Sequence, residues 1–358
     1  MSLPVPETIE EITPEWVTQA LRESGAIQNA TIIQIESRIL GQNVGFLSVV
    51  AWLGLTYDQP EPDAPKAVVI KVIPKPGKHR ELGEEMHAFQ REILFYRDVA
   101  PQIDIRLPKM YYAASEPPNM TIIMEDLSYC RPGDQLKGMS LDLVLATAVI
   151  VGRLQAKFWN NDALEQLDWM PESDHFEKDY AANWDSMEEH FGHLIPEEGK
   201  ELGRRMKEHI PWLFNEIEHR PRTIVHSDLR EDNLIYDETG AITEVIILDW
   251  QLATRRMGVY DITRLMAASA LPEQRRGHEI EILRAWHATL VAEGVTDYYW
   301  EEALYDMRLA LLEFICFPVK FHKAFIGKTG RSAEIMKIIL TRGFATAIDL
   351  QAHVAMPS

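Results

Sequence analysis

The sequence has few of the features that mark several protein classes. Only two cysteines, Cys130 and Cys316, occur in 358 residues, and they lie far apart. A disulfide framework, a zinc finger and a CxxC redox motif are therefore excluded. Cationic residues are also few, because 36 Lys and Arg stand against 55 Asp and Glu, giving a net charge of −19. Nucleic-acid binding needs a basic surface and anionic membranes attract basic segments, so we expect neither partner.

Long apolar runs are missing as well. The most apolar late stretch, residues 309–321, is too short to cross a membrane and contains Glu313 and Pro318, which predicts a core helix. The first residues are acidic and contain prolines, without the charged and apolar regions of a signal peptide. We therefore expect a cytoplasmic protein. The sequence does not indicate its oligomeric state.

The chain has instead the composition of a globular protein of about two units, with 46% hydrophobic and 25% charged residues. Segments rich in β-branched and aromatic residues predict two strands within 31–57, separated by a glycine-bearing turn, and further strands at 67–73, 109–114 and 121–124. A short helix is expected from Thr13 to about Gly25, and an apolar stripe from Leu82 to Tyr96 predicts a second.

The second half of the sequence is mostly helical. One long helix is predicted over 141–160, further helices within 174–218, and four or five more within 261–355, with short strands at 223–226 and 244–250. The predicted class is α+β, with a strand-rich unit over residues 1–125 and a helical unit over 126–358. We expect the change between them near residues 125–130.

The most informative stretch is a polar loop followed by an apolar strand. Asp228 and Asn233 stand five residues apart after His226, and Asp249 ends an apolar strand 16 residues after Asn233. Phosphoryl transfer needs one carboxylate for the attacking hydroxyl, and an amide oxygen and a second carboxylate for Mg²⁺ on the nucleotide phosphates. Each residue alone also has an ordinary role in loops or strand ends, but the combination is specific. Asp232 is expected to be a surface acid.

With these residues the chain resembles the aminoglycoside phosphotransferase, choline kinase and ecdysteroid kinase-like families. The resemblance rests on IVHSDLREDNLIY and VIILDWQLA, with VVIKVI and IIMEDL upstream, and covers nearly the whole chain. It implies a two-lobed protein-kinase-like fold with an antiparallel-sheet N-lobe and a mainly helical C-lobe. In that light Asp228 is the catalytic base, Asn233 and Asp249 are the Mg²⁺ ligands, and His226 packs behind the loop.

The N-lobe is expected to hold ATP. Lys71 lies in a buried strand, where an unpaired charge is costly, and the resemblance gives it the phosphates and a helix glutamate as partners. Glu85 and Glu92 both lie at the edge of the apolar stripe, and the surrounding sequence favours Glu92. Gly41 and Gly45, between the first two strands, would let backbone N–H groups approach phosphate, although a plain hairpin turn is the alternative.

The resemblance assigns further positions between and after the strands. The segment at the lobe boundary implies backbone contacts to the adenine edge at Glu125 and Leu127, the alternative being a linker without ligand. Asp261 either braces the catalytic loop through backbone N–H groups or is an ordinary N-cap. The chain departs from the families at Ser227, where glycine is usual, and at Gln155, where histidine often stands. Neither departure removes a catalytic group.

The acceptor is expected to be a small molecule. Asp261 lies only 12 residues after Asp249, and the long activation segment and APE motif that support peptide substrates in protein kinases are missing. Aromatic and acidic side chains suit a cationic ligand or an apolar alcohol, with a slight preference for the cation. The candidates for the pocket are Tyr180, Trp184, Trp212, Tyr298, Trp300 and Glu302, and the alternative for each aromatic residue is a place in the core. Arg230, Arg255 and Arg256 are candidates for binding an anionic acceptor instead.

The leading hypothesis is an ATP- and Mg²⁺-dependent phosphotransferase that acts on a hydroxyl of an aminoglycoside-like, choline-like or hydrophobic alcohol. The alternative is a non-catalytic nucleotide-binding regulatory module of the same fold. A third hypothesis is a metal-dependent hydrolase that uses His226, Asp228 and Asp249, but further histidines at metal-ligand spacing are missing.

Overall fold

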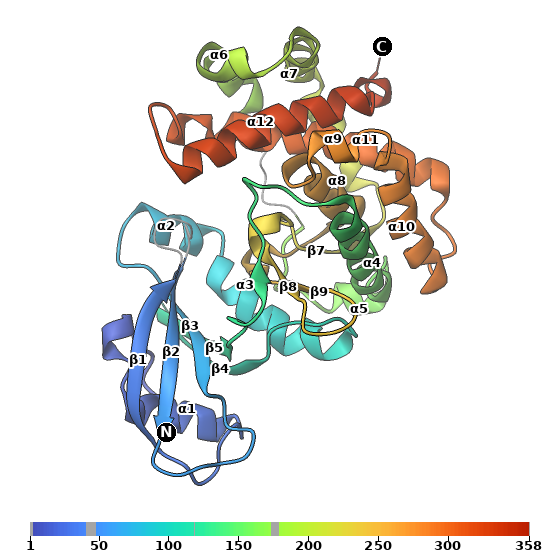
Figure 1. The fold of residues 1–358 in the computed structure, drawn as a ribbon. Coiled ribbons are helices and arrows are strands. Elements are labelled where there is room, and N and C mark those ends of the chain that lie inside the picture. The colour runs from blue at the N-terminus through green and yellow to red at the C-terminus, as the bar shows by residue number, and fades with distance from the viewer. Residues whose placement is uncertain (1–2, 41–47, 118, 173–178, 358) are drawn as a thin grey trace.

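The computed structural model describes residues 3–40, 48–117, 119–172 and 179–357. Its N-terminal part is a five-stranded antiparallel sheet with strand order β1-β2-β3-β5-β4, below and to the left of the helical part in Figure 1. The strands are β1 (Ile32–Leu40), β2 (Val49–Tyr57), β3 (Ala67–Val72), β4 (Met110–Glu116) and β5 (Asn119–Glu125). The predicted α+β class is confirmed.

The two faces of this sheet pack against different helices. Helix α1 (Pro14–Glu23) begins at Thr13, whose side chain accepts a hydrogen bond from the backbone N–H of Trp16. Its buried side chains form one cluster with the apolar residues of β2 and β3, including Ile70 and Val72. Because strand side chains alternate between faces, Lys71 points to the opposite face, toward α3 (Ala88–Leu94).

The helix that the apolar stripe predicts is divided in the structure. Helix α2 (Lys78–Glu85) ends before His87, which has a left-handed φ of 50°, and α3 starts at the next residue. This backbone conformation interrupts the helical hydrogen-bond ladder. The apolar stripe continues through α3, where Phe89 is buried, and into the turn after it, where Tyr96 is buried. A π-helical turn (Phe95–Val99) continues α3 toward β4.

The helical part contains five short strands beside its helices. Strands β6 (Arg131–Pro132), β8 (Leu234–Asp237) and β9 (Glu244–Ile247) form one antiparallel sheet, and β7 (Arg222–Val225) pairs with β10 (Thr254–Met257). The helices are α4 (Leu141–Lys157), α5 (Asp162–Glu165), α6 (Tyr180–Phe191), α7 (Glu197–Glu218), α8 (Val259–Ala268), α9 (Pro272–Arg275), α10 (Glu279–Ala292), α11 (Trp300–Phe321) and α12 (Arg331–Asp349). The 3-10 turns are Ile9–Glu11, Ala100–Gln102, Gly192–Leu194, Glu231–Asn233, Trp250–Leu252, His322–Ala324 and Ala352–Ala355.

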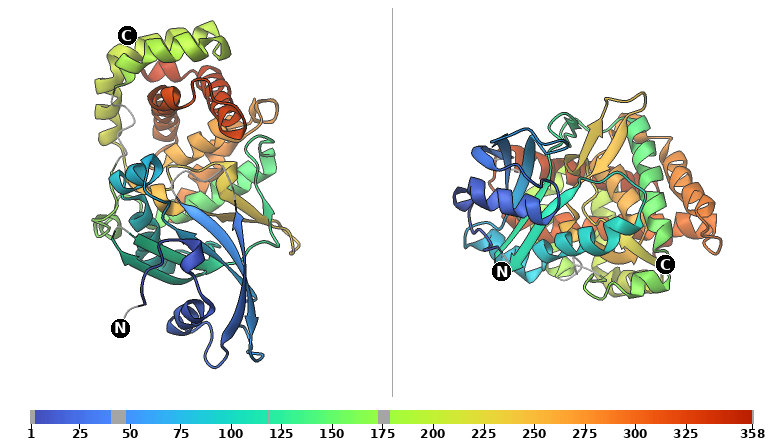
Figure 2. Two further views of the ribbon diagram at one scale, coloured as in Figure 1. Left: turned by 90° about the vertical axis from the view of Figure 1, so that its left-hand side faces the viewer. Right: turned by 90° about the horizontal axis from the view of Figure 1, so that it is seen from below.

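Helix α8 lies at the centre of the helical part. Every one of its ten residues is buried, and α4, α10, α11 and α12 pack against it, with α6 and α7 further out, beyond α12 (Figures 1 and 2). Helices α4 and α10 approach closely at Gly152, where a Cβ would lie 2.9 Å from the Cβ of Thr289. Among the described residues no helix combines the length and apolarity of a membrane span.

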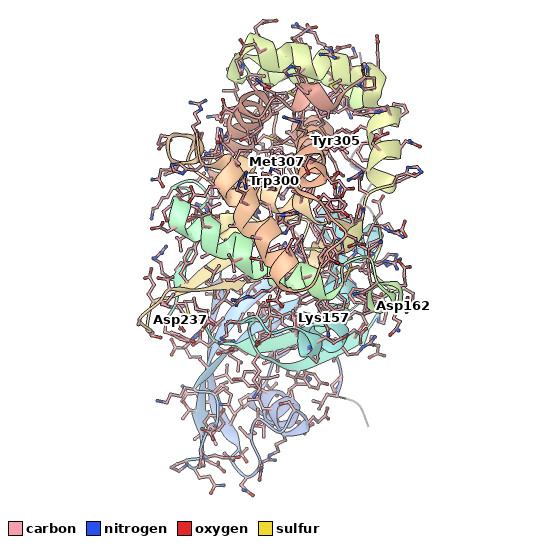
Figure 3. The ribbon with its side chains drawn as sticks, turned by 90° about the vertical axis from the view of Figure 1, so that its right-hand side faces the viewer. Lys157, Asp162, Asp237, Trp300, Tyr305 and Met307 are labelled. Carbon is pink, nitrogen blue, oxygen red and sulfur yellow. The ribbon has the colours of Figure 1, made fainter. Side chains whose placement is uncertain are left out.

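The predicted pocket aromatics are mostly core residues. Tyr180 and Trp184 are buried in α6 against α7, and Tyr298 is buried beside Trp159 and Trp286. Trp300 lies with Tyr305 and Met307 on α11, in the helical part and away from the N-terminal sheet (Figure 3). Trp212 packs edge-on against His209, and Glu302 caps the start of α11.

A buried ion pair joins α7 to α11. Arg220, just after α7, lies 2.5 Å from Oδ1 of Asp306, and the Tyr298 hydroxyl donates to Oδ2 at 2.8 Å. The Asp306 side chain is 1% exposed. Burial raises the pKa of this carboxyl to about 6, although the Arg220 charge and the Tyr298 hydrogen bond oppose the shift. The folded protein therefore keeps this proton at a pH where the unfolded chain has lost it.

We predict that Asp306→Asn changes the pH dependence of stability in a defined direction. As pH rises from about 4 to about 6, the Asp306 carboxyl loses its proton in the unfolded chain before it does so in the folded protein. The free energy of unfolding of wild type therefore falls over this range. The variant has no carboxyl at this position and lacks this fall. The free energy of unfolding of the variant relative to wild type should rise by on the order of 2 kcal/mol between about pH 4.5 and about pH 7.5. Urea unfolding at both pH values measures it.

The exposed Asp297, in the loop before α11, provides the matched control. Asp297→Asn should follow wild type across this pH range. If Asp306→Asn does so too, Asp306 is not held protonated by the fold.

Candidate active site

The loop that carries Asp228 and Asn233 joins β7 to β8. Residue Asn233 directly precedes β8, and Asp249 follows β9 by two residues. The two strands pair with Leu234 opposite Ile247, and the Leu248 N–H donates to the Asn233 carbonyl at 2.9 Å. This ladder places Asn233 and Asp249 side by side at the same end of the small sheet, which the spacing in the sequence alone does not require.

Helix α8 holds the start of this loop through a buried carboxylate. Asp261 accepts hydrogen bonds from the backbone N–H groups of His226 at 2.8 Å and Ser227 at 3.0 Å. Burial raises the pKa of Asp261, while His226 and the two backbone donors oppose the rise. The N-cap of α8 is Gly258, three residues earlier. Of the two expectations for Asp261, the structure shows loop bracing, and the N-cap alternative is wrong.

The two departures from the family pattern are accommodated locally. Ser227 has a left-handed φ of 66°, a conformation that favours glycine, and its hydroxyl bonds that of Thr254 at 2.7 Å. Gln155 of α4 donates to the Gly258 carbonyl at 2.9 Å and to Asp261 at 3.4 Å, and accepts from Trp286 at 2.7 Å. Both substitutions therefore support the loop backbone.

His226 packs behind the loop. One ring nitrogen lies 2.7 Å from the Leu248 carbonyl, and the other accepts from the Asp228 N–H at 3.2 Å. Its ring lies 4.7 Å from that of Trp250, which stacks on Phe95 at 3.9 Å. Both ring nitrogens are engaged within the fold, so His226 orients the two strands and is not a metal ligand here.

Asp228 lies between two arginines. Oδ1 accepts from Arg264 of α8, and Oδ2 accepts from Arg230 at 3.1 Å and from the Asn233 amide at 3.1 Å. Burial would raise the pKa of this carboxyl, but the Arg230 and Arg264 charges outweigh burial and hold the pKa well below its usual range. Asp228 is therefore ionised, as a proton acceptor must be.

Lys71 forms the second cluster of charges. Its ammonium lies 2.7 and 2.8 Å from the two carboxylate oxygens of Glu92 and 3.0 Å from Oδ1 of Asp249. Glu85 is exposed, so the partner of Lys71 is Glu92. Burial lowers the pKa of Lys71, but Asp249 and Glu92 outweigh that effect and raise it. The ammonium stays charged and joins β3, α3 and Asp249, the second residue after β9.

The end of β5 leads into the segment predicted to read the adenine edge. The Glu125 carboxylate pairs with Arg106 at 2.6 Å and accepts from the Lys109 N–H at 3.0 Å. The Leu127 carbonyl accepts from the Cys130 N–H at 2.9 Å, which leaves its N–H as the group for an adenine contact. These contacts remain predictions. The predicted phosphate-loop residues, Gly41 and Gly45, lie outside the described residues.

Three expectations about charged residues near the loop are wrong. Asp232 is no surface acid: its side chain is 5% exposed and binds Arg230, Arg331 and the Gln135 N–H. Arg255 points away from Asp228, donating to the Met170 carbonyl at 2.9 Å. Arg256 forms a buried pair with Glu313.

The residue that sequence reasoning missed is Arg264. It carries no motif of its own, but it follows Asp261 by three residues, which places both on one face of α8. That spacing was the available signal, because a helix that braces the loop with one residue can reach the Asp228 carboxylate with the next along the same face.

The fold is shared with solved structures that include aminoglycoside phosphotransferases and a choline kinase. Solved structures of similar fold include a candidate aminoglycoside phosphotransferase from Ralstonia eutropha, 16% identical, with a TM-score of 0.58 over 96% of this chain and 99% of that one. A choline kinase from Cryptosporidium parvum is 12% identical, with a TM-score of 0.56 over 89% and 90%. The GDP complex of an aminoglycoside 2′-phosphotransferase is 13% identical, with a TM-score of 0.52 over 94% and 97%.

The family is given by sequence. The profile of the Ecdysteroid kinase-like family matches residues 42–295, more than half of the chain, so the protein belongs to this family. A search of curated proteins finds no significant match. The solved structures of similar fold share too little sequence with this chain to identify its substrate.

Proposed function

We propose that this protein transfers the γ-phosphate of ATP to a hydroxyl group of a small molecule. The observation that carries the proposal is the convergence of Asp228, Asn233, Asp249 and the Lys71–Glu92 pair from four separate segments. Phosphoryl transfer requires mainly positioning and neutralisation of charge, and this set supplies both.

Each residue has a role that its surroundings support. Lys71, held by Glu92, would bind the nucleotide phosphates. Asp228 would hydrogen-bond the acceptor hydroxyl and receive its proton as the acceptor oxygen bonds to the γ-phosphorus and the bond to the β–γ bridging oxygen breaks, releasing ADP. The alternative is a non-catalytic nucleotide-binding module. It is less well supported, because the proposed base, metal ligands and phosphate-binding lysine are all present in the site.

Asn233 and Asp249 fit a magnesium ion by the chemistry of their donors. The Asn233 amide nitrogen donates to Asp228, so the oxygen is the group available for a cation. Asp249 has a side chain that is 27% exposed and supplies a carboxylate next to it. Oxygen ligands are those that Mg²⁺ prefers, and the ion would neutralise charge on the phosphates.

A hydrolase that uses a protein-held metal centre is less well supported. Within the described residues there is no group of three His, Cys, Asp or Glu side chains placed to hold a metal ion. Both nitrogens of His226, the candidate ligand of that hypothesis, are engaged with protein groups.

The chain between Asp249 and Asp261 supports a small acceptor. It consists of a 3-10 turn (Trp250–Leu252), the strand β10 paired with β7, and the start of α8. Apart from Ala253 and Gly258, the residues of this interval lie in these elements, which hold the loop. No length is left there for a segment that docks a peptide substrate.

Two substitutions should separate the metal ligand from the base. Asp249→Asn removes the charge that would hold Mg²⁺, so Mg²⁺-dependent stabilisation by ATP should disappear. Asp228→Asn retains an oxygen for Arg264, so the variant should still bind Mg-ATP but transfer phosphate at least about 10²-fold more slowly. Thermal melting with and without Mg-ATP, and ATP consumption with an accepted alcohol, measure the two effects.

Asp185→Asn, at a carboxylate that is 76% exposed, is the control and should behave as wild type in both assays. Reversed behaviour of the two site variants would mean that their roles are exchanged.

The acceptor class can be tested directly. We expect ATP consumption in the presence of some alcohol, amino-alcohol, aminoglycoside or sterol, and no incorporation of labelled phosphate into generic protein substrates. Steady incorporation into protein without consumption on any small alcohol would contradict the proposal. Mg-ATP binding without turnover on any acceptor would instead favour the regulatory-module alternative.

A further inference from the structure

Arg230 is a cation of the catalytic loop to which the proposed function gives no role. Its Nε lies 3.1 Å from Oδ2 of Asp228, the same oxygen that the Asn233 amide contacts. Its Nη1 donates to Asp232 at 2.9 Å and to the Gln135 side chain at 3.0 Å. The guanidinium is thus fixed at two of its nitrogens, and its side chain is still 16% exposed.

Asp232 holds Arg230 in a network that reaches a distant helix. The Asp232 carboxylate also accepts from the Gln135 N–H at 2.8 Å and from Arg331 at 2.6 Å. Arg331 is the first residue of α12, and it binds Asp134 at 2.9 Å as well. The Asp232 carboxylate thus holds both guanidinium groups, and it stays paired when only one of the two arginines contacts it.

The three cations around the site differ in what they can reach. Lys71 is held by Glu92 and Asp249. Arg264 is 3% exposed and contacts Oδ1 of Asp228 from α8, with its guanidinium carbon 5.0 Å from the Phe317 ring. Only Arg230 combines contact with Asp228, on the Asn233 side, with partial exposure.

The location of Asp228 fixes that of the transferred phosphoryl group. Resting on the proposed function, Asp228 hydrogen-bonds the attacking oxygen, which itself lies within about 3.5 Å of the γ-phosphorus at the start of transfer. A guanidinium in contact with Asp228 on the metal-ligand side is then within one side-chain rotation of the phosphoryl oxygens. Negative charge on those oxygens is what a phosphotransferase must neutralise.

We propose that Arg230 is a further catalytic residue, which turns from Asp228 to the γ-phosphate of ATP when nucleotide binds. Arg264 makes this exchange possible, because it stays on the other oxygen of Asp228 and keeps that buried carboxylate paired. Asp232 keeps its contact to Arg230 Nη1 during the turn and is therefore a positioning residue. The guanidinium fork matches the geometry of phosphate oxygens and can contact two of them at once.

The proposal separates ATP from ADP, because only ATP has the γ-phosphate. Wild type should bind Mg-ATP about ten- to a hundredfold more tightly than Mg-ADP, the ratio expected for one or two charge-assisted hydrogen bonds. Arg230→Met should bind Mg-ADP as wild type does and lose most of this preference. Arg230→Lys, which keeps the charge without the fork, should retain part of it. Calorimetric titration of each protein with both nucleotides gives the two dissociation constants.

Arg255→Met is the matched control. Arg255 lies on β10, the strand paired with β7, and its side chain is 14% exposed and donates to the Met170 carbonyl instead of facing Asp228. It should keep the wild-type preference for ATP. Folding of Arg230→Met is expected, because Asp228 keeps Arg264 and Asp232 keeps Arg331. With an accepted alcohol, kcat of Arg230→Met should fall by about 10²-fold or more, while that of Arg255→Met stays unchanged.

The outcomes also separate this proposal from the function on which it rests. An equal ATP preference in wild type and Arg230→Met, or no preference in wild type, would overturn the role of Arg230 and leave the phosphotransferase proposal standing. Failure of wild type to bind either nucleotide would overturn the proposed function and Arg230 with it.

Discussion

The burial of one ammonium group between two carboxylates determines how the site is assembled. Lys71 is 14% exposed, and a buried charge of this kind is stable only with well-placed partners. Glu92 comes from a helix of the N-terminal part and Asp249 from the small sheet of the helical part. The need to pair Lys71 therefore ties the two parts together at the point where phosphate would bind. An incoming nucleotide would meet a cation that is already oriented.

Buried acids also hold cations or backbone segments around the loop that carries Asp228 and Asn233. Asp261 fixes the backbone before Asp228, and Arg264, one helical turn later on α8, fixes its side chain. Asp232 fixes Arg230 and reaches α12 through Arg331. Because α8 is buried along its whole length, the loop is held by a helix that is packed on all sides. A precise geometry at Asp228 is what positioning catalysis demands.

The sequence predicted the motif residues and the fold class because both depend on local pattern. A lysine inside an apolar strand and an aspartate at the end of another are visible in the chain itself, and the structure brings them within 3.0 Å. The break of the predicted helix at His87, the burial of Asp232 and the contact of Arg264 were not foreseeable in this way. The last two depend on neighbours far along the chain, Arg331 for Asp232 and Asp228 for Arg264. Of the aromatic residues considered for a pocket, Tyr180, Trp184 and Tyr298 follow the core alternative, which composition alone does not distinguish from a pocket lining.

We propose that nucleotide phosphates bind at Lys71. The thermal stabilisation of Lys71→Met by Mg-ATP tests this binding most directly. Wild type should melt at a temperature that rises with Mg-ATP concentration, as binding to the folded state requires. The variant should still melt cooperatively without nucleotide, because Glu92 can take up a proton when its cation is removed. Its melting temperature should not respond to Mg-ATP. A rise equal to that of wild type would contradict the account, because the phosphates would then bind elsewhere.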